Sequence, residues 1–232
     1  MSVPPREYPR LTMEKHYMIM GSILVVVAGV AVLLVTDALG RGKALGCVAK
    51  MIASTAFLAL AVHRGALDTP YGCGLLAGLF LSWWGDLFLF FREPRVFLAG
   101  LVSFLLGHVA YVTAFLLHGI AISWTLGAAA ALVVVAIPVI LWLAPNLGNM
   151  RAPVYAYIVV ISLMVAFSAG AVGRGGATPM VIGAVLFYVS DVMVARDRFV
   201  KSDAWNRWIG LPLYYGGQMV LAYTAGLVLP PA

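Results

Sequence analysis

A succession of apolar runs, each long enough to cross a lipid bilayer, limits what this chain can fold into. An α-helix of about 20 apolar residues spans the hydrocarbon core, and such runs lie near residues 18–35, 44–63, 71–91, 96–117, 121–143, 153–172, 176–195 and 207–229. Because lipid cannot hydrogen-bond exposed backbone groups, each run must be helical. With 63% hydrophobic and 10% charged residues, the chain has too few polar side chains to coat a soluble globule. The sequence predicts an all-α, polytopic membrane helical bundle of about eight transmembrane helices.

The domain organisation follows from the short connections between the runs, which leave no room for a soluble domain. We expect a polar N-terminal leader over residues 1–17 and a single transmembrane helical-bundle domain over residues 18–232. The first run lacks a small-residue cleavage site, so we interpret it as a retained span and not as a cleaved signal.

The charge distribution predicts the orientation of the bundle. The net charge is +6, and basic loops that orient membrane helices explain it better than a nucleic-acid partner, which we do not expect. About nine Lys and Arg residues lie beside the loops after the first, third, fifth and seventh runs, against five on the side of both termini. We therefore expect the odd-numbered loops, and an active site near them, at the cytoplasmic face of the membrane, the cell membrane in a bacterial source.

Two aspartates lie inside apolar runs in similar contexts. The segments GLFLSWWGDLFL at 78–89 and GAVLFYVSDVMV at 183–194 place Asp86 and Asp191 about 105 residues, or four helices, apart. This echo predicts a parallel 4+4 internal repeat, in which the two carboxylates lie at similar depth and can meet between the halves. Alternatively, Gly and Ser are simply common where membrane helices pack closely. An intramembrane carboxylate is costly, so both aspartates are candidate functional residues.

Further polar side chains form stripes on several runs at helical spacing. His108 and Tyr111 are three residues apart, and the other groups are also within about a turn of each other: Lys50 with Ser54, Ser82 with Asp86, and Tyr214 and Tyr215 with Gln218. Together they predict a buried polar chamber for binding or reaction. Packing offers another interpretation, with Lys50 as a partner that only neutralises Asp86 and the remaining groups as hydrogen bonds between helices.

Basic residues follow both acid-bearing runs directly, including Arg92, Arg95, Arg196 and Arg198. They are most simply solvated caps, although at the mouth of the chamber they could hold a lipid phosphate. The sequence has no GxSxG, HExxH or Walker motif, which excludes the familiar serine hydrolases, zincins and nucleotide-driven enzymes.

The segments that carry these polar groups closely resemble a known family. GLFLSWWGDLFLFF, FLAGLVSFLLGHVAYVTAF, GAVLFYVSDVMVARDRF and LPLYYGGQMVLAY are similar, in order and spacing, to the YhhN and TMEM86 family of lysoplasmalogenases. The resemblance covers most of the chain from Lys50 to Tyr223, and SDVMVARDRF is its most specific element. One departure is that Met51 follows Lys50, where the family commonly has proline.

The resemblance implies hydrolysis of the vinyl ether bond of choline or ethanolamine 1-alkenyl lysophospholipids. Protonation of the alkene carbon creates an oxocarbenium ion that water captures, and a carboxylic acid in a low-dielectric bundle can stay protonated to serve as the donor. We expect Asp86 and Asp191 to be the catalytic acid/base pair, with His108 orienting water. Hydrogen bonds and charge at the substrate would come from Lys50, Ser82, Tyr111, Ser190, Tyr214, Tyr215 and Gln218.

The partners follow from the same expectation. A lysophospholipid substrate and membrane lipids are expected, whereas the sequence leaves the oligomeric state open. No cofactor is expected, and zinc held by Asp86, Asp191 and His108 is the minority alternative. Two other classes remain open: a small proton-coupled carrier with acids at the membrane midplane, and a non-catalytic lipid-binding protein.

Overall fold

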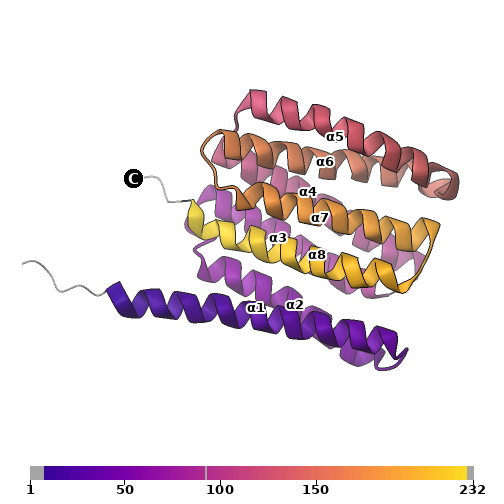
Figure 1. Cartoon of the computed structure of the whole chain (residues 1–232), viewed down its shortest axis with the longest axis horizontal. Helices are drawn as coiled ribbons and strands as arrows, with labels where there is room; N and C mark the ends of the chain where they lie inside the picture. Colours follow the sequence, from indigo (N-terminus) through magenta and orange to yellow (C-terminus); the bar gives the residue numbers. More distant parts are fainter. Residues whose placement is uncertain (1–7, 92, 229–232) are drawn as a thin grey trace, which may run out of the picture.

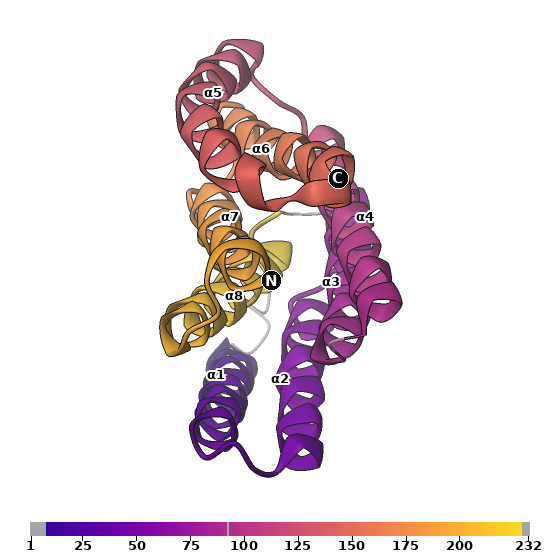
Figure 2. The same ribbon diagram turned by 90° about the vertical axis from the view of Figure 1, so that its right-hand side faces the viewer.

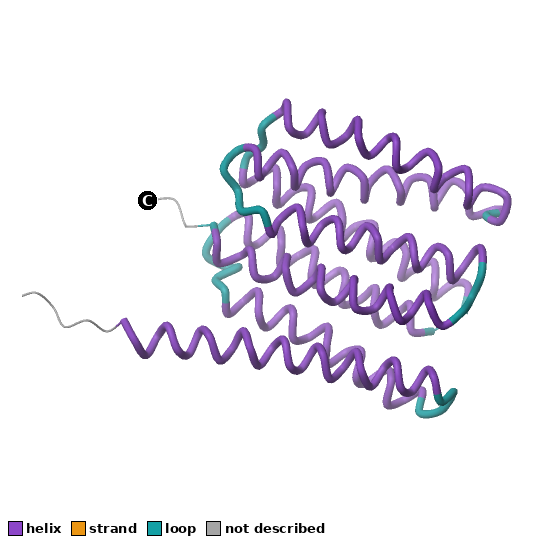
Figure 3. The backbone as a smooth tube through the Cα atoms, viewed as in Figure 1, coloured by secondary structure: helices purple, strands orange, loops and turns teal. Residues whose placement is uncertain are grey.

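The computed structural model describes residues 8–91 and 93–228, and these residues form eight α-helices with short turns and no strand (Figures 1 and 3). All eight predicted runs fall on these helices. Their bounds are α1 (Tyr8–Ala38), α2 (Lys43–His63), α3 (Pro70–Phe90), α4 (Pro94–His118), α5 (Ile122–Leu143), α6 (Arg151–Gly173), α7 (Pro179–Ala195) and α8 (Ala204–Thr224).

Helix α1 is longer than predicted, because it begins at Tyr8, inside the expected polar leader. Its apolar part, long enough to cross a membrane, covers His16–Ala38. Pro9 lies in the first turn of the helix, where the backbone N–H that proline lacks would have no partner within the helix. The helix can therefore extend from the apolar part toward the N-terminus as far as Tyr8. Residues 1–7 of the expected leader lie outside the described residues.

Within the described part of the chain, seven helices are long and apolar enough to cross a membrane, and α8 is the exception. It carries Asn206, Arg207 and Gln218, and these lower its hydropathy. Nevertheless α8 runs alongside the other helices and packs against α7 and α2 (Figure 1). The protein is therefore an integral, multi-pass membrane protein, and its most polar helix is covered by its neighbours.

The helices pack as consecutive hairpins. Figure 2 shows α1 with α2 at one end of the cross-section, α5 with α6 at the other, and the α3–α4 and α7–α8 pairs between them. Helix α2 contacts α3 and α8, and α6 likewise contacts α7 and α4. This is the neighbour pattern that a 4+4 repeat predicts, although the duplication itself stays a prediction.

Small residues let the central helices approach closely. A Cβ on Gly183 of α7 would lie 3.1 Å from the carbonyl oxygen of Gly217 in α8, and a Cβ on Gly78 of α3 would lie 2.5 Å from the Tyr111 ring of α4. Such contacts matter because lipid supplies no hydrophobic force between helices, so close packing holds them together. The outermost helix, α5, instead exposes most of its aliphatic side chains, as expected beside lipid chains.

Candidate active site

The first polar cluster surrounds Asp86, which is almost fully buried between α2, α3 and α8. Its Oδ1 lies 3.1 Å from the Lys50 ammonium. Its Oδ2 accepts a hydrogen bond of 2.5 Å from the Ser54 hydroxyl and one of 2.6 Å from Tyr214. Tyr215 lies 3.3 Å from the Ser54 oxygen and completes the cluster. Both carboxylate oxygens of Asp86 are therefore occupied by protein groups.

The second cluster surrounds Asp191 of α7. Tyr157 of α6 donates a 2.6 Å hydrogen bond to Asp191 Oδ2, and His108 Nε2 of α4 lies 3.1 Å from the same oxygen. His108 Nε2 also lies 2.9 Å from the Tyr157 oxygen. A proton on Nε2 fits these contacts, because Nε2 faces two oxygen atoms. Asp191 Oδ1 accepts no hydrogen bond from the described residues.

The other predicted polar groups lie near these clusters without joining either carboxylate. Tyr111 donates a 2.7 Å hydrogen bond to Gln218 Oε1 and so links α4 to α8. Ser82 bonds the backbone oxygen of Gly78, one turn earlier in its own helix. Ser190 is buried but makes no side-chain hydrogen bond to another described residue. The two contacts resemble the helix-packing interpretation more than the predicted contacts with substrate.

The two carboxylates do not form the pair that the sequence predicted. No hydrogen bond or ion pair among the described residues joins Asp86 to Asp191. The buried ring of Phe187 lies between the clusters, with its centroid 4.6 Å from that of His108 and 5.3 Å from that of Tyr214. The physical reason is that each acid faces the helices that pack against its own hairpin. For Asp86 these are α2 and α8, and for Asp191 they are α6 and α4.

The alternative of a zinc site requires the side chains of Asp86, Asp191 and His108 to lie close enough to bind one ion. The structure instead puts Asp86 in the other cluster, and within residues 8–91 and 93–228 no three His, Cys, Asp or Glu side chains are grouped so as to hold a metal ion. His108 Nε2 is already directed at Asp191 and Tyr157.

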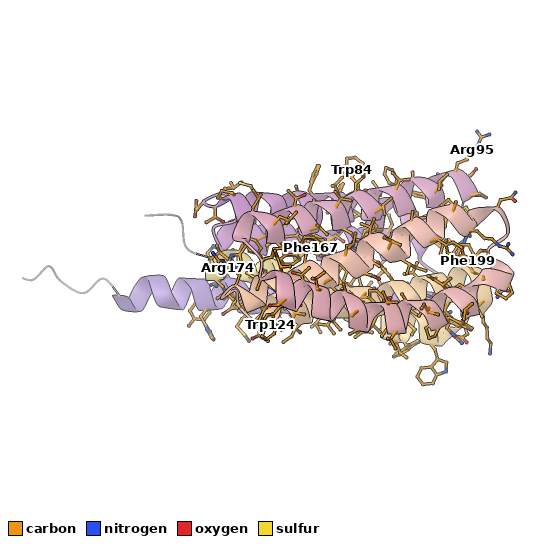
Figure 4. All side chains as sticks on the ribbon, turned by 90° about the horizontal axis from the view of Figure 1, so that it is seen from above. Trp84, Arg95, Trp124, Phe167, Arg174 and Phe199 are labelled. Carbon is orange, nitrogen blue, oxygen red and sulfur yellow. The ribbon has the colours of Figure 1, made fainter. Side chains whose placement is uncertain are left out.

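A largely apolar cavity adjoins only the second cluster. Its cavity volume is about 60 Å³, it is partly open to the surroundings, and Asp191 and Tyr157 line it. The rest of its wall is mainly aliphatic and aromatic and includes Leu101, Phe104, Val139, Leu143, Val154, Ile158, Phe97 and Phe199. Phe199 lies at the same end of the bundle as Arg95, opposite Arg174 and Trp124 (Figure 4). An alkyl chain and one reactive carboxyl group can therefore meet in this cavity.

Sequence reasoning missed Tyr157, although it contacts both other members of the second cluster. The available signal was two phenols, Tyr155 and Tyr157, in the otherwise apolar run YAYIVV, on a helix with no intramembrane charge. Ser54 was recognised as sharing a helix face with Lys50 but was not assigned to the site.

Comparisons with known proteins identify the family of the chain. The YhhN family profile matches residues 45–225, most of the chain. The chain belongs to the YhhN family. A Bos taurus protein named lysoplasmalogenase TMEM86A is 30% identical over 169 residues, which cover 68% of each chain. The Homo sapiens protein of that name is 28% identical over 168 residues, again 68% of each chain.

A Mycobacterium bovis protein named lysoplasmalogenase is 30% identical over 142 residues, 59% of this chain and 49% of its own, so the match spans about half of that relative. No solved structure matches. The part shared with the YhhN family extends from before Lys50 to beyond Gln218, so it contains both polar clusters.

Proposed function

We propose that this YhhN protein hydrolyses the vinyl ether bond of choline or ethanolamine 1-alkenyl lysophospholipids to a fatty aldehyde and a glycerophospho-base. One observation carries the proposal: an acid with a free oxygen, Asp191, lines an apolar cavity inside a membrane bundle. The names of the TMEM86A and mycobacterial relatives support the same class of hydrolase.

The chemistry needs one group that gives a proton to carbon and later takes one from water. Protonated Asp191 donates from Oδ1 to the alkene carbon remote from oxygen, which leaves an oxocarbenium ion beside the new carboxylate. Water adds to that cation while its proton returns to Asp191. The hemiacetal then collapses: the C–O bond to glycerol breaks as the glycerol oxygen takes the proton of Asp191, the hemiacetal hydroxyl gives its proton back to Asp191, and aldehyde and alcohol leave. Atoms balance with water as the only co-reactant.

Tyr157 and His108 act on the other oxygen. Both can donate a hydrogen bond to Asp191 Oδ2, and such bonds strengthen when the acceptor becomes charged. They therefore stabilise the charge that develops on the carboxyl group as the proton leaves, and because both contact Oδ2 they leave Oδ1 available as the donor. General acid and base help of this kind is typically worth about 10²- to 10⁴-fold in rate.

Asp86 takes a different role from the one that the sequence predicted for it. Lys50, Ser54 and Tyr214 occupy both of its oxygens, and it does not line the cavity. We assign Asp86 and Lys50 to a buried ion pair that holds α2, α3 and α8 together, so Lys50 offsets an acid and does not contact phosphate.

The membrane orientation is part of the proposal. The cavity wall includes the last turn of α5 and the turn after α7, so it lies at the end with the odd-numbered loops. Most of the basic residues outside the membrane lie at this end, although Arg6 and Arg92 of the charge count lie outside the described residues. Because basic loops face the cytoplasm, we place the cavity end there, and a reporter fused to the C-terminus tests it.

The experiment compares aldehyde release from 1-alkenyl lysophosphatidylethanolamine by purified wild-type protein, Asp191→Asn and Asp68→Asn, measured by mass spectrometry. Asp68 is an exposed loop aspartate and serves as the matched control. We expect Asp191→Asn to lose about 10²- to 10⁴-fold in rate, and Asp68→Asn to match wild type. Aldehyde release by Asp191→Asn at the wild-type rate would refute the assignment, and no release by folded wild type would refute the function.

A further inference from the structure

An arginine lies beside the cavity, in the turn that follows α7. Residues Arg196–Val200 form a π-helical turn, a rare conformation that is frequent at functional sites. Arg198 is exposed, and its guanidinium carbon lies 4.3 Å from the centroid of the Phe97 ring. Phe97 and Phe199 line the cavity and contact each other edge to face, with centroids 6.4 Å apart. The arginine therefore rests on the aromatic rim of the cavity.

The other charges of this turn are already paired. Arg196 donates hydrogen bonds of 2.7 and 2.8 Å to Asp203, which also lies 3.7 Å from Lys201. Asp197 accepts hydrogen bonds from Ser202 and Asn206. Arg198, by contrast, has no carboxylate within ion-pairing distance among the described residues. Its side chain is held by the Phe97 ring while its N–H groups stay available to an anion.

We propose that Arg198 binds the phosphate group of the lysophospholipid while the vinyl ether lies at Asp191. This inference rests on the proposed function and identifies how the polar end of the substrate is held. A guanidinium suits a phosphate because its planar fork can donate two parallel hydrogen bonds. Stacking on an aromatic ring leaves that fork free and reduces the freedom lost on binding.

The spacing along the chain fits such a substrate. Arg198 follows Asp191 by seven residues, which would be a rise of about 10 Å if all of them were α-helical, and the π-helical turn from Arg196 makes the rise somewhat shorter. The extended glycerol unit between phosphorus and the vinyl carbon is of comparable length. With phosphate at the rim, the vinyl ether reaches Asp191 and the alkyl chain continues along the apolar wall.

The test pairs two substrates that differ only in the phosphate-bearing head group: 1-alkenyl lysophosphatidylethanolamine and the corresponding alkenylglycerol, both at fixed surface concentration in the same micelles. Arg198→Gln should raise the KM for the phospholipid about 10-fold or more, the loss expected for a charge-assisted hydrogen bond, with little change in kcat. The KM for the alkenylglycerol should stay unchanged, and Arg198→Lys should restore part of the difference. Arg174→Gln is the control, since Arg174 lies at the opposite end (Figure 4).

Equal effects of Arg198→Gln on both substrates would overturn the phosphate site and show a structural role. Inorganic phosphate could inhibit both reactions while wild type shows no preference for the phosphorylated lipid. That result would assign the site to free phosphate and overturn the proposal that Arg198 binds the phosphate of the lipid. If wild type hydrolyses neither compound, a binding measurement separates the phosphate site from the proposed hydrolysis. It compares the saturated alkyl ether analogue of the lysophospholipid with the saturated alkylglycerol. A binding preference for the phospholipid that Arg198→Gln abolishes would support the site even then, and no preference would overturn it.

Discussion

The substitution Lys50→Met tests the buried ion pair directly. It removes the ammonium that lies 3.1 Å from Asp86, whose side chain is only 2% exposed. Methionine keeps the length and apolar stem of lysine, so packing between α2 and α3 changes little. What remains is a buried carboxylate without its counter-charge.

The size of the loss follows from what still contacts that carboxylate. Breaking a buried ion pair by removing one partner typically costs about 3–5 kcal/mol. Ser54 and Tyr214 still donate to Asp86 Oδ2, so we expect a loss near the lower limit, about 3 kcal/mol. In the double variant Lys50→Met with Asp86→Asn no charge remains, and the same two hydroxyl groups can bond the new amide oxygen. Most of the lost stability should therefore return.

Stability is measured by reversible unfolding of the purified protein in mixed micelles, for wild type, both single variants and the double variant. The coupling energy between positions 50 and 86 is expected to exceed about 1 kcal/mol, as for directly contacting residues. If the losses of the single variants simply add in the double variant, the ion pair does not stabilise the fold. The folded double variant should also release aldehyde, and its failure to do so would return Asp86 to the catalytic machinery.

Two further predictions concern packing and orientation. Gly78→Ala should destabilise the protein by about 1–3 kcal/mol in the same unfolding assay, because the new Cβ overlaps the Tyr111 ring. Gly127→Ala should instead stabilise α5 by up to about 1 kcal/mol, because no atom lies within 4 Å of the new Cβ and alanine favours the helix. For a bacterial host, alkaline phosphatase fused after Ala232 should be active, because the proposed orientation puts both termini outside the cytoplasm. A fluorescent green fluorescent protein fusion at that position would contradict the orientation.

Most of the fold could be predicted because a bilayer leaves few alternatives. Length and apolarity located all eight helices within a few residues, except at the start of α1, where the helix continues into the polar segment at Tyr8. The apolar run of α8 was located in the same way, although polar residues such as Gln218 keep this helix, among the described residues, below the hydropathy of the other seven.

The site was only partly predictable. The cost of an intramembrane charge identified Lys50, Asp86, His108 and Asp191, and the structure shows that these four make two separate contacts, Lys50 with Asp86 and His108 with Asp191. Which of these side chains contact each other depends on which helices pack against each hairpin. That packing is part of the tertiary structure and is not visible in the sequence of one helix. Tyr157 was missed for the same reason, since a phenol at one position of an apolar helix has no meaning until the facing helices are known.

The two clusters occupy corresponding places, and one difference decides which can do chemistry. Each aspartate lies between the helix before it and a helix of the other half of the chain, α8 for Asp86 and α4 for Asp191. At Asp86 a lysine and two hydroxyl groups occupy both oxygens, so a substrate would have to displace a protein partner. At Asp191, which lines the cavity, both partners share one oxygen, and the other accepts no hydrogen bond from the described residues. A group that gives and then recovers a proton needs such a free oxygen, and this requirement, more than burial or charge alone, selects Asp191.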